Sequence, residues 1–182
     1  SSDLVAGTKK ILDFAKQHNA PIMSSSLFRH EWGMEAALRM RDSGEFGPIE
    51  HITATLHGRY ALPGWMIYGQ HPVWSVMTLM GPGVEAVSLY EYKDTCHGMI
   101  TWRDKYPSHV WYGEPFDKFE YNRTSVHFKK KFYSFTPSIE GSFEYGHHYE
   151  MFRLAATFRE MVRSRQEPVP HQEILEVRSE EH

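Results

Sequence analysis

The chain has 182 residues, of which 41% are hydrophobic and 24% are charged. This composition is ordinary for a globular protein and supplies enough apolar surface for a core, so disorder of the whole chain is excluded. The 20 Lys and Arg residues are outnumbered by 23 Asp and Glu, and the net charge of −3 argues against a nucleic-acid partner. A single cysteine, Cys96, excludes an intramolecular disulfide. No apolar run reaches the roughly 20 residues of a membrane span, and we expect a cytoplasmic protein.

Residues 1–28 are predicted to form one helix and one short strand. Ser2-Asp3 is typical of a helix cap, and the apolar residues that follow recur at helical spacing until His18-Asn19, where asparagine can adopt a left-handed conformation. Pro21-Ile22-Met23 then predicts a short buried strand. One helix and one strand cannot bury both of their apolar faces, so we expect this segment to be an incomplete first domain, the last piece of a larger α/β layer.

Residues 29–182 are predicted to form a single α+β domain. The clearest strand follows the Gly47-Pro48 turn, where polar and apolar residues alternate. The polar positions are His51, Thr53, Thr55 and His57, and the apolar positions between them are Ile52, Ala54 and Leu56. This alternation predicts a sheet that is covered on one side only. Further strands are expected at Val84–Tyr90, Thr95–Arg103, His109–Tyr112 and Phe119–Phe128.

The connections between these later strands are too short to contain a helical crossover, so we expect mostly antiparallel pairing. Helices are expected at Glu31–Arg41, within Trp65–Met80, around the amphipathic run 151–161, and from His171 onward. The predicted fold class is therefore α+β: a mostly antiparallel, open-faced sheet with helices packed on one face, preceded by the helix and strand of residues 1–28.

The segment Gly64–Pro72 contains the best candidates for chemistry. Trp65, Tyr68, Gln70 and His71 fall together where a loop enters a helix, and a histidine there can exchange a proton near neutral pH. The alternative is that His71 only packs against the start of the helix. Arg29 follows the short predicted strand and is a second candidate, either for ligand binding or for a surface ion pair.

Two other groups of polar residues are weaker candidates. His147-His148 with Glu150 does not have the spacing of a known metal motif, so we expect no metal site. His51, His57 and Arg59 share the polar face of the first long strand, where they could contact a ligand, a partner subunit or water. The sequence contains no G-x-G-x-x-G or Walker motif, so no cofactor is expected to bind this chain alone.

Four stretches, taken in order, resemble the C-terminal portion of the Gfo/Idh/MocA oxidoreductases, the family of glucose-fructose oxidoreductase and inositol dehydrogenase. Residues 11–23 resemble the last helix and strand of that family's N-terminal Rossmann domain, and residues 44–49 resemble the turn into its second domain. Tyr68-Gly69-Gln70-His71-Pro72-Val73 resembles its G-x-H helix start. Residues 149–158, 167–170 and 173–176 resemble its closing helices and the turn between them.

The resemblance implies a two-domain enzyme whose missing Rossmann domain binds NAD or NADP. It implies that 29–182 bind a sugar-like small-molecule substrate and form a homo-oligomer through the open sheet face. The implied reaction is hydride transfer at a carbinol carbon of a sugar, polyol or related compound, with His71 as the proton-transfer residue or its close helper. Arg29, Trp65, Tyr68 and Gln70 would line the substrate pocket.

The sequence departs from the family pattern D-x-G-x-H-x-x-D at both acidic positions, which are Ile67 and Trp74 here. A histidine without these acids lacks the groups that would orient it. The alternative hypothesis is therefore a non-catalytic module that binds a sugar-like ligand or a protein and lacks a cofactor site.

Overall fold

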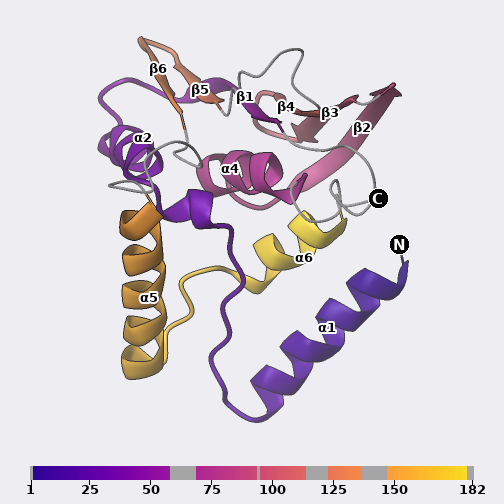
Figure 1. Ribbon diagram of the computed structural model, residues 1–182, viewed down its shortest axis with the longest axis vertical. Helices are drawn as coiled ribbons and strands as arrows, with labels where there is room; N and C mark the ends of the chain where they lie inside the picture. The colour runs from indigo at the N-terminus through magenta and orange to yellow at the C-terminus, as the bar shows by residue number, and fades with distance from the viewer. Residues whose placement is uncertain (1, 58–68, 94, 114–122, 137–146, 180–182) are drawn as a thin grey trace.

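The computed structural model describes residues 2–57, 69–93, 95–113, 123–136 and 147–179. These residues form a six-stranded open sheet with helices on one face (Figure 1). This arrangement confirms the predicted fold class. None of the described helices is both long and apolar enough to cross a membrane.

The sheet is mostly antiparallel, with one parallel pair at its centre. Its strands are β1 (Ile49–His57), β2 (Val84–Tyr92), β3 (Thr95–Trp102), β4 (Ser108–Gly113), β5 (Arg123–Phe128) and β6 (Lys131–Phe135). They lie in the order β2-β3-β4-β1-β5-β6, and only β1 and β4 run parallel among the neighbouring strands. Parallel neighbours need a crossover. Here the crossover has two parts. After β1 the chain crosses the covered face of the sheet in a helix (Gln70–Met80) and then forms the β2–β3 hairpin, and β4 returns to lie beside β1.

The helices are α1 (Ser2–Gln17), α2 (Trp32–Ser43), α4 (Gln70–Met80), α5 (His147–Ser164) and α6 (His171–Ser179), with a 3₁₀ turn, η1, at Leu27–His30. Left-handed backbone angles mark the ends of two helices, and the first of these is the end predicted at His18-Asn19. Asn19 has φ 49° just after α1, and Gly44 has φ 67° at the end of α2. Glycine and asparagine are the residues that adopt this left-handed conformation at least cost.

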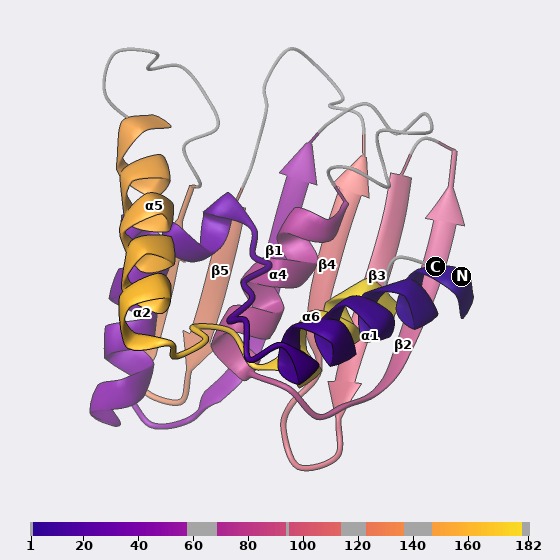
Figure 2. The ribbon, with the colours of Figure 1, turned by 90° about the horizontal axis from the view of Figure 1, so that it is seen from below.

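The core is centred on α4, which is buried around its whole circumference. Trp74, Val76, Met77 and Leu79 are each at most 2% exposed. One side of α4 packs on β1 and β4, and its other sides contact α2, η1 and α6. Figure 2 shows α4 against the sheet. In this view α1 and α6 cross in front of the sheet, and α5 lies beside α2 near β5. The alternation in β1 is confirmed, because Ile52, Ala54 and Leu56 are its buried residues and its other side chains are half-buried.

The prediction of a strand at Pro21–Met23 is wrong for the chain as described. Those residues make no β ladder, because none of the described strands lies beside them. The backbone N–H of Ile22 instead donates to Oε1 of Glu167 at 3.0 Å. A strand requires a neighbouring strand to accept its hydrogen bonds, and here a side chain takes that place.

We expect Gly98→Ala to destabilise the sheet. A Cβ at Gly98 would lie 2.6 Å from Cγ2 of Val110 and 3.2 Å from Cδ2 of Leu89, on the two strands that flank β3. Overpacking of this kind costs about 1–3 kcal/mol. The matched control is Gly7→Ala in α1, where a Cβ would meet nothing within 4 Å and helix propensity should add about 0.5–1 kcal/mol. Urea unfolding of both variants measures the difference, and equal stability would contradict the packing argument.

Candidate functional site

His71 lies in the first turn of α4 and is held there by η1. Its Nδ1 atom is 2.7 Å from Oγ of Ser26, the residue that caps η1. The Ser26 hydroxyl also accepts a hydrogen bond from the backbone N–H of Phe28 at 3.2 Å. The Phe28 ring stacks on the His71 ring at a centroid distance of 4.9 Å. Residues 45 positions apart therefore fix both the position and the plane of the imidazole.

Burial lowers the pKa of His71 to about 4, so the imidazole is neutral at pH 7. Either Nδ1 of His71 or Oγ of Ser26 can be the donor in the hydrogen bond that joins them. When Nδ1–H donates to the Ser26 hydroxyl, Nε2 carries the lone pair that can accept a proton. The site therefore holds an oriented, uncharged histidine.

Of the other predicted site residues, Gln70 and Arg29 lie in the described part of the chain. Gln70 is half-buried and opens α4 beside His71. Trp65 and Tyr68 lie outside the described residues, as do Arg59 and Ile67. The structure therefore places Gln70 next to His71 and leaves the remaining two aromatic predictions as predictions.

Arg29 is engaged away from the first turn of α4. Its Nη1 donates to Oγ1 of Thr78 at 3.2 Å, near the far end of α4, and forms a buried ion pair with Glu173 of α6. Burial raises the pKa of Glu173 although the Arg29 charge opposes the shift. The pair joins η1 to α6, and a ligand contact by Arg29 remains a prediction.

His30 was not among the predicted site residues, and it is more deeply buried than its neighbour Arg29. Burial, Arg29 and Arg153 together lower the pKa of His30 to about 4. Its Nε2 has no hydrogen-bond partner among the described residues. Close by, Glu35 accepts hydrogen bonds from Nε of Arg153 at 2.6 Å and from the Tyr149 hydroxyl at 2.9 Å. The dipeptide Arg29-His30 was visible in the sequence, but no local pattern indicates which side chain turns inward.

An apolar groove of about 530 Å³ lies between the segment before η1 and α5. Its lining includes Met23, Leu27, Met151 and Phe158. The nearby helices also carry uncovered apolar side chains: Ile11 and Phe14 of α1 are 60% and 63% exposed, and Phe152 of α5 is 72% exposed. Figure 1 shows α1 and α5 extending from the helical side of the molecule, away from the sheet.

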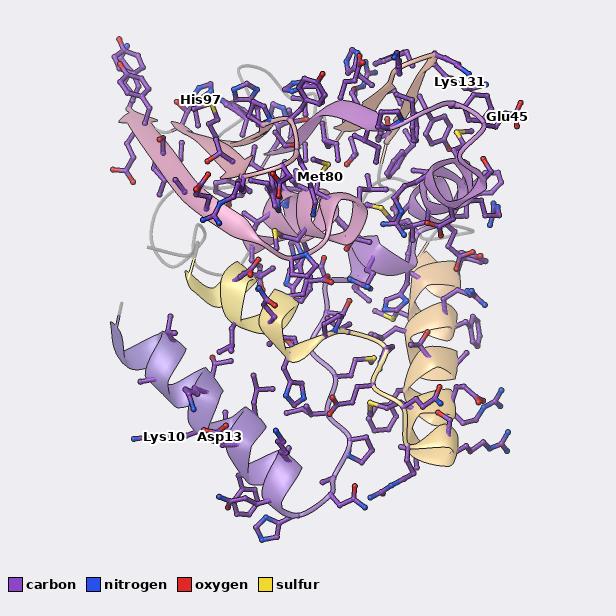
Figure 3. The ribbon with its side chains drawn as sticks, turned by 180° about the vertical axis from the view of Figure 1, so that it is seen from behind. Lys10, Asp13, Glu45, Met80, His97 and Lys131 are labelled. Carbon is purple, nitrogen blue, oxygen red and sulfur yellow. The ribbon has the colours of Figure 1, made fainter. Side chains whose placement is uncertain are left out.

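The open face of the sheet carries a second group of titratable residues. It consists of five histidines on four strands, which we call the histidine face: His51 and His57 of β1, His97 of β3, His109 of β4 and His127 of β5. Figure 3 shows His97 on this side of the sheet, with Met80 on the opposite, helix-covered side. No group of three or more His, Cys, Asp or Glu side chains in the described residues is arranged to hold a metal ion.

No protein-family model matches the sequence, and no curated protein matches it. Solved structures do match its fold. A putative myo-inositol dehydrogenase from Sinorhizobium meliloti aligns with a TM-score of 0.80 at 13% identity, over 97% of this chain and 66% of that one. Scyllo-inositol dehydrogenase from Lactobacillus casei, with bound NAD(H) and scyllo-inositol, aligns with a TM-score of 0.76 at 12% identity, over 97% and 65%. A levoglucosan dehydrogenase in complex with NADH and levoglucosan gives 0.73 at 12% identity, over 97% and 66%.

The chain thus has the fold of the C-terminal domain of inositol and sugar dehydrogenases. It spans 64–66% of the length of these structures. At sequence identities of 11–14%, these matches show a shared fold and nothing further. They agree with the expected architecture and assign no activity to this chain.

The pKa of His71 predicts a pH-dependent loss of stability. Because folding lowers this pKa from 6.5 to about 4, the folded state binds fewer protons than the unfolded state. Stability is then fully present above pH 6.5 and falls as the pH drops toward 4. Between pH 7.5 and pH 5.0 the loss due to this group is about 2 kcal/mol.

We therefore expect His71→Gln to lose about 2 kcal/mol less than the native chain between these two pH values, by urea unfolding. His18→Gln, at an exposed position after α1, is the matched control and should keep the native pH dependence. If the free energy of unfolding of His71→Gln changed with pH as much as that of the native chain, the burial of a neutral imidazole would be contradicted.

Proposed function

We propose that this chain is the substrate-binding and oligomerisation part of an NAD(P)-dependent oxidoreductase that acts on a sugar, polyol or related carbinol. The observation that carries the proposal is the neutral, oriented His71 at the start of α4, in a fold shared with inositol and sugar dehydrogenases. In such a reaction the carbinol carbon loses a hydride and its hydroxyl loses a proton. His71 is the group in this chain that would accept the proton at Nε2.

We propose that the dinucleotide site lies outside this chain. The sequence has no G-x-G-x-x-G motif, and the described sheet is antiparallel except for the β1–β4 pair. NAD or NADP would be bound by a separate domain of the parent protein, where it supplies the hydride acceptor. The role of this chain is to bind the substrate hydroxyls, orient the carbinol and take up the proton.

The N-terminal segment supports a parent with a further domain. Ile11 and Phe14 of α1 are left uncovered, and residues 21–23 have no partner strand in the described chain. Apolar side chains in such numbers favour a covering layer. We assign residues 1–28 to the end of a Rossmann domain, where residues 21–23 would pair with a strand of that domain, and residues 29–182 to the substrate-binding and oligomerisation domain. The uncovered side chains and the groove beside α5 would contact the Rossmann domain.

The open sheet face is proposed as the surface for homo-oligomerisation. Besides the five histidines it presents Tyr90, Trp111 and Phe132, and Tyr90 and Phe132 are 65% and 58% exposed. Aromatic and histidine side chains with few charges are typical of an interface rather than of a solvated face. The residues between the aromatic ones are mostly Thr and Ser, which pack closely and can form hydrogen bonds.

A second candidate function is a non-catalytic module that binds a sugar-like ligand. Trp74 favours it, because this position carries an acid in the dehydrogenase pattern and here packs in the core with 1% exposure. No acid can therefore assist His71 from that turn of α4. The Ser26 hydroxyl holds the imidazole instead.

Activity of the complete encoded protein tests the catalytic proposal. We expect it to reduce NAD⁺ or NADP⁺ in the presence of one or more members of a polyol and sugar panel, followed by absorbance at 340 nm. His71→Ala should lower turnover by about 10²–10⁴-fold, as is typical of a lost general acid/base. The control is His18→Ala, which should retain the native rate.

If the native protein binds a member of the panel by calorimetry and turns over none, the non-catalytic module is correct. An unchanged rate in His71→Ala would remove this residue from the mechanism.

The oligomerisation proposal is tested on the 182-residue chain. Thr53 lies at the middle of β1 on the open face, and Thr53→Arg would bring a charge into a symmetric interface, where it faces its own copy. We expect multi-angle light scattering to show a shift from dimer to monomer. Gln17→Arg, which adds the same charge at an exposed position on α1, should leave the mass unchanged. A native chain that is monomeric at every concentration would show that the open face is exposed to solvent and is not an interface.

A further inference from the structure

The histidine face is unusual because its centre contains titratable rings and no permanent charge. Across the face, β2 contributes Tyr90 and Tyr92, β6 contributes Phe132 and Ser134, and the strands between them carry the five histidines. Arg123 is a charged residue on this face, and it lies at the start of β5. Arg103 follows the end of β3 and pairs with Glu85 at 3.4 Å.

Three of the five rings lie close together. The centroid of His51 is 5.0 Å from that of His109 and 5.8 Å from that of His127. Nε2 of His51 is 3.4 Å from Nδ1 of His109 and 3.0 Å from Oγ1 of Thr53. Like charges at such separations repel each other, so two of these rings are protonated together only at a substantial cost.

Backbone contact fixes the proton position in His51. Its Nδ1 lies 3.0 Å from the Pro107 carbonyl oxygen, which can only accept a hydrogen bond, so Nδ1 carries the proton. Nε2 then holds the lone pair that faces His109 and Thr53 when the ring is neutral. A second proton on Nε2 would point toward the His109 ring.

The remaining two histidines lie beside Trp111: the ring centroids of His57 and His97 are 4.5 Å and 6.1 Å from that of Trp111. The ring centroid of His127, in the cluster of three, is also 4.8 Å from that of Phe132. Burial already lowers the pKa of His57 in the single chain, and burial together with the neighbouring His51 lowers the pKa of His109. A second protein surface laid over these rings would remove more water and disfavour their charged forms further.

We propose that the histidine face joins two copies of this chain only while its histidines are neutral, so that self-association is lost in mild acid. This inference rests on the proposed oligomerisation and adds its control by pH. The occupant is a second copy because the centre of the described face carries no permanent charge that would select an acidic or basic partner, and Arg123 lies at its edge. A surface of aromatic, histidine, Thr and Ser side chains is compatible with itself under a two-fold axis.

The direction of the pH effect follows from proton linkage. The associated state lowers the histidine pKa values and binds fewer protons, so association is strongest above the ordinary histidine pKa of about 6.5 and weakens below it. Each histidine that must release a proton on association weakens it about 30-fold at pH 5.0 relative to pH 7.5. A two-fold axis makes every such residue count twice, so one histidine per copy changes the dissociation constant about 10³-fold.

Sedimentation equilibrium of the 182-residue chain at pH 7.5 and pH 5.0, in 150 mM salt with EDTA, tests the proposal. We expect a dimer at pH 7.5 and a dissociation constant at least about 100-fold higher at pH 5.0. Near-ultraviolet circular dichroism at both pH values shows that the chain stays folded. A dissociation constant that is the same at both pH values overturns the inference and leaves the proposed oligomerisation intact.

Variants connect the effect to these residues. The double variant His109→Gln/His127→Gln should dimerise at pH 7.5 and show a smaller rise of its dissociation constant at pH 5.0 than the native chain. The single variant His109→Gln should lie between it and the native chain, and supplies the comparison if the double variant does not fold. His18→Gln removes a histidine from outside the face and should keep the full pH dependence.

Three outcomes would overturn the proposal on different grounds. Full pH dependence in both histidine-face variants would place the responsible groups elsewhere. A native chain that is monomeric even at pH 7.5 would remove the proposed oligomerisation as well. A dimer that forms without EDTA and dissociates when it is added would show that a metal ion, rather than neutral histidines, joins the copies.

Discussion

The structure depends on the need to bury α4 on all sides. A helix with Trp, Met, Val and Leu around its whole circumference is unstable next to water, and one sheet face can cover only half of it. The chain therefore places β1 and β4 on one side and α2, η1 and α6 on the other. The open sheet, the helical layer beneath it and the position of the site all follow from this requirement.

Polar contacts fix the C-terminal end of α4 and the turn that follows it. Arg41 donates to the carbonyls of Thr78 and Leu79, and Lys105 donates to that of Met80. The Glu176 carboxylate accepts the N–H groups of Gly83 and Val84 in the next turn. The contacts of Arg41 and Lys105 satisfy carbonyls that a helix end leaves without intrahelical partners. The opposite end carries His71, so the candidate site is built on a rigid element rather than on a free loop.

The sequence predicted those features that one element determines by itself. The alternation in β1 and the apolar surface of α4 are local patterns, and both elements were placed correctly. The strand β6 was missed because Lys129-Lys130-Lys131 conceals a tight turn, and Lys131 is already the first residue of the strand. The predicted strand at 21–23 was wrong because strands depend on neighbours that a local pattern does not contain.

The site was predictable to a similar extent. His71 could be located from its own segment, but its partner Ser26 is 45 residues away and belongs to a 3₁₀ turn without a sequence signature. Arg29 pairs with Glu173 across 144 residues, and His30 is buried by α5 from the far end of the chain. The histidine face needed the register of four strands, because its members are spread from residue 51 to residue 127.

The contact between the first and last helices has a consequence for biosynthesis. α1 packs on α6, and Ile22 is tied to Glu167, which lies 145 residues later. A ribosome adds residues at about 5–20 per second, so α1 leaves the ribosome about 7–30 s before the residue that anchors the chain next to it. Throughout that interval the apolar side chains of α1 have no native partner in this chain. Of the described helices, α1 is thus made well before α6, the helix on which it packs in this chain, and its contacts within this chain form only late in synthesis.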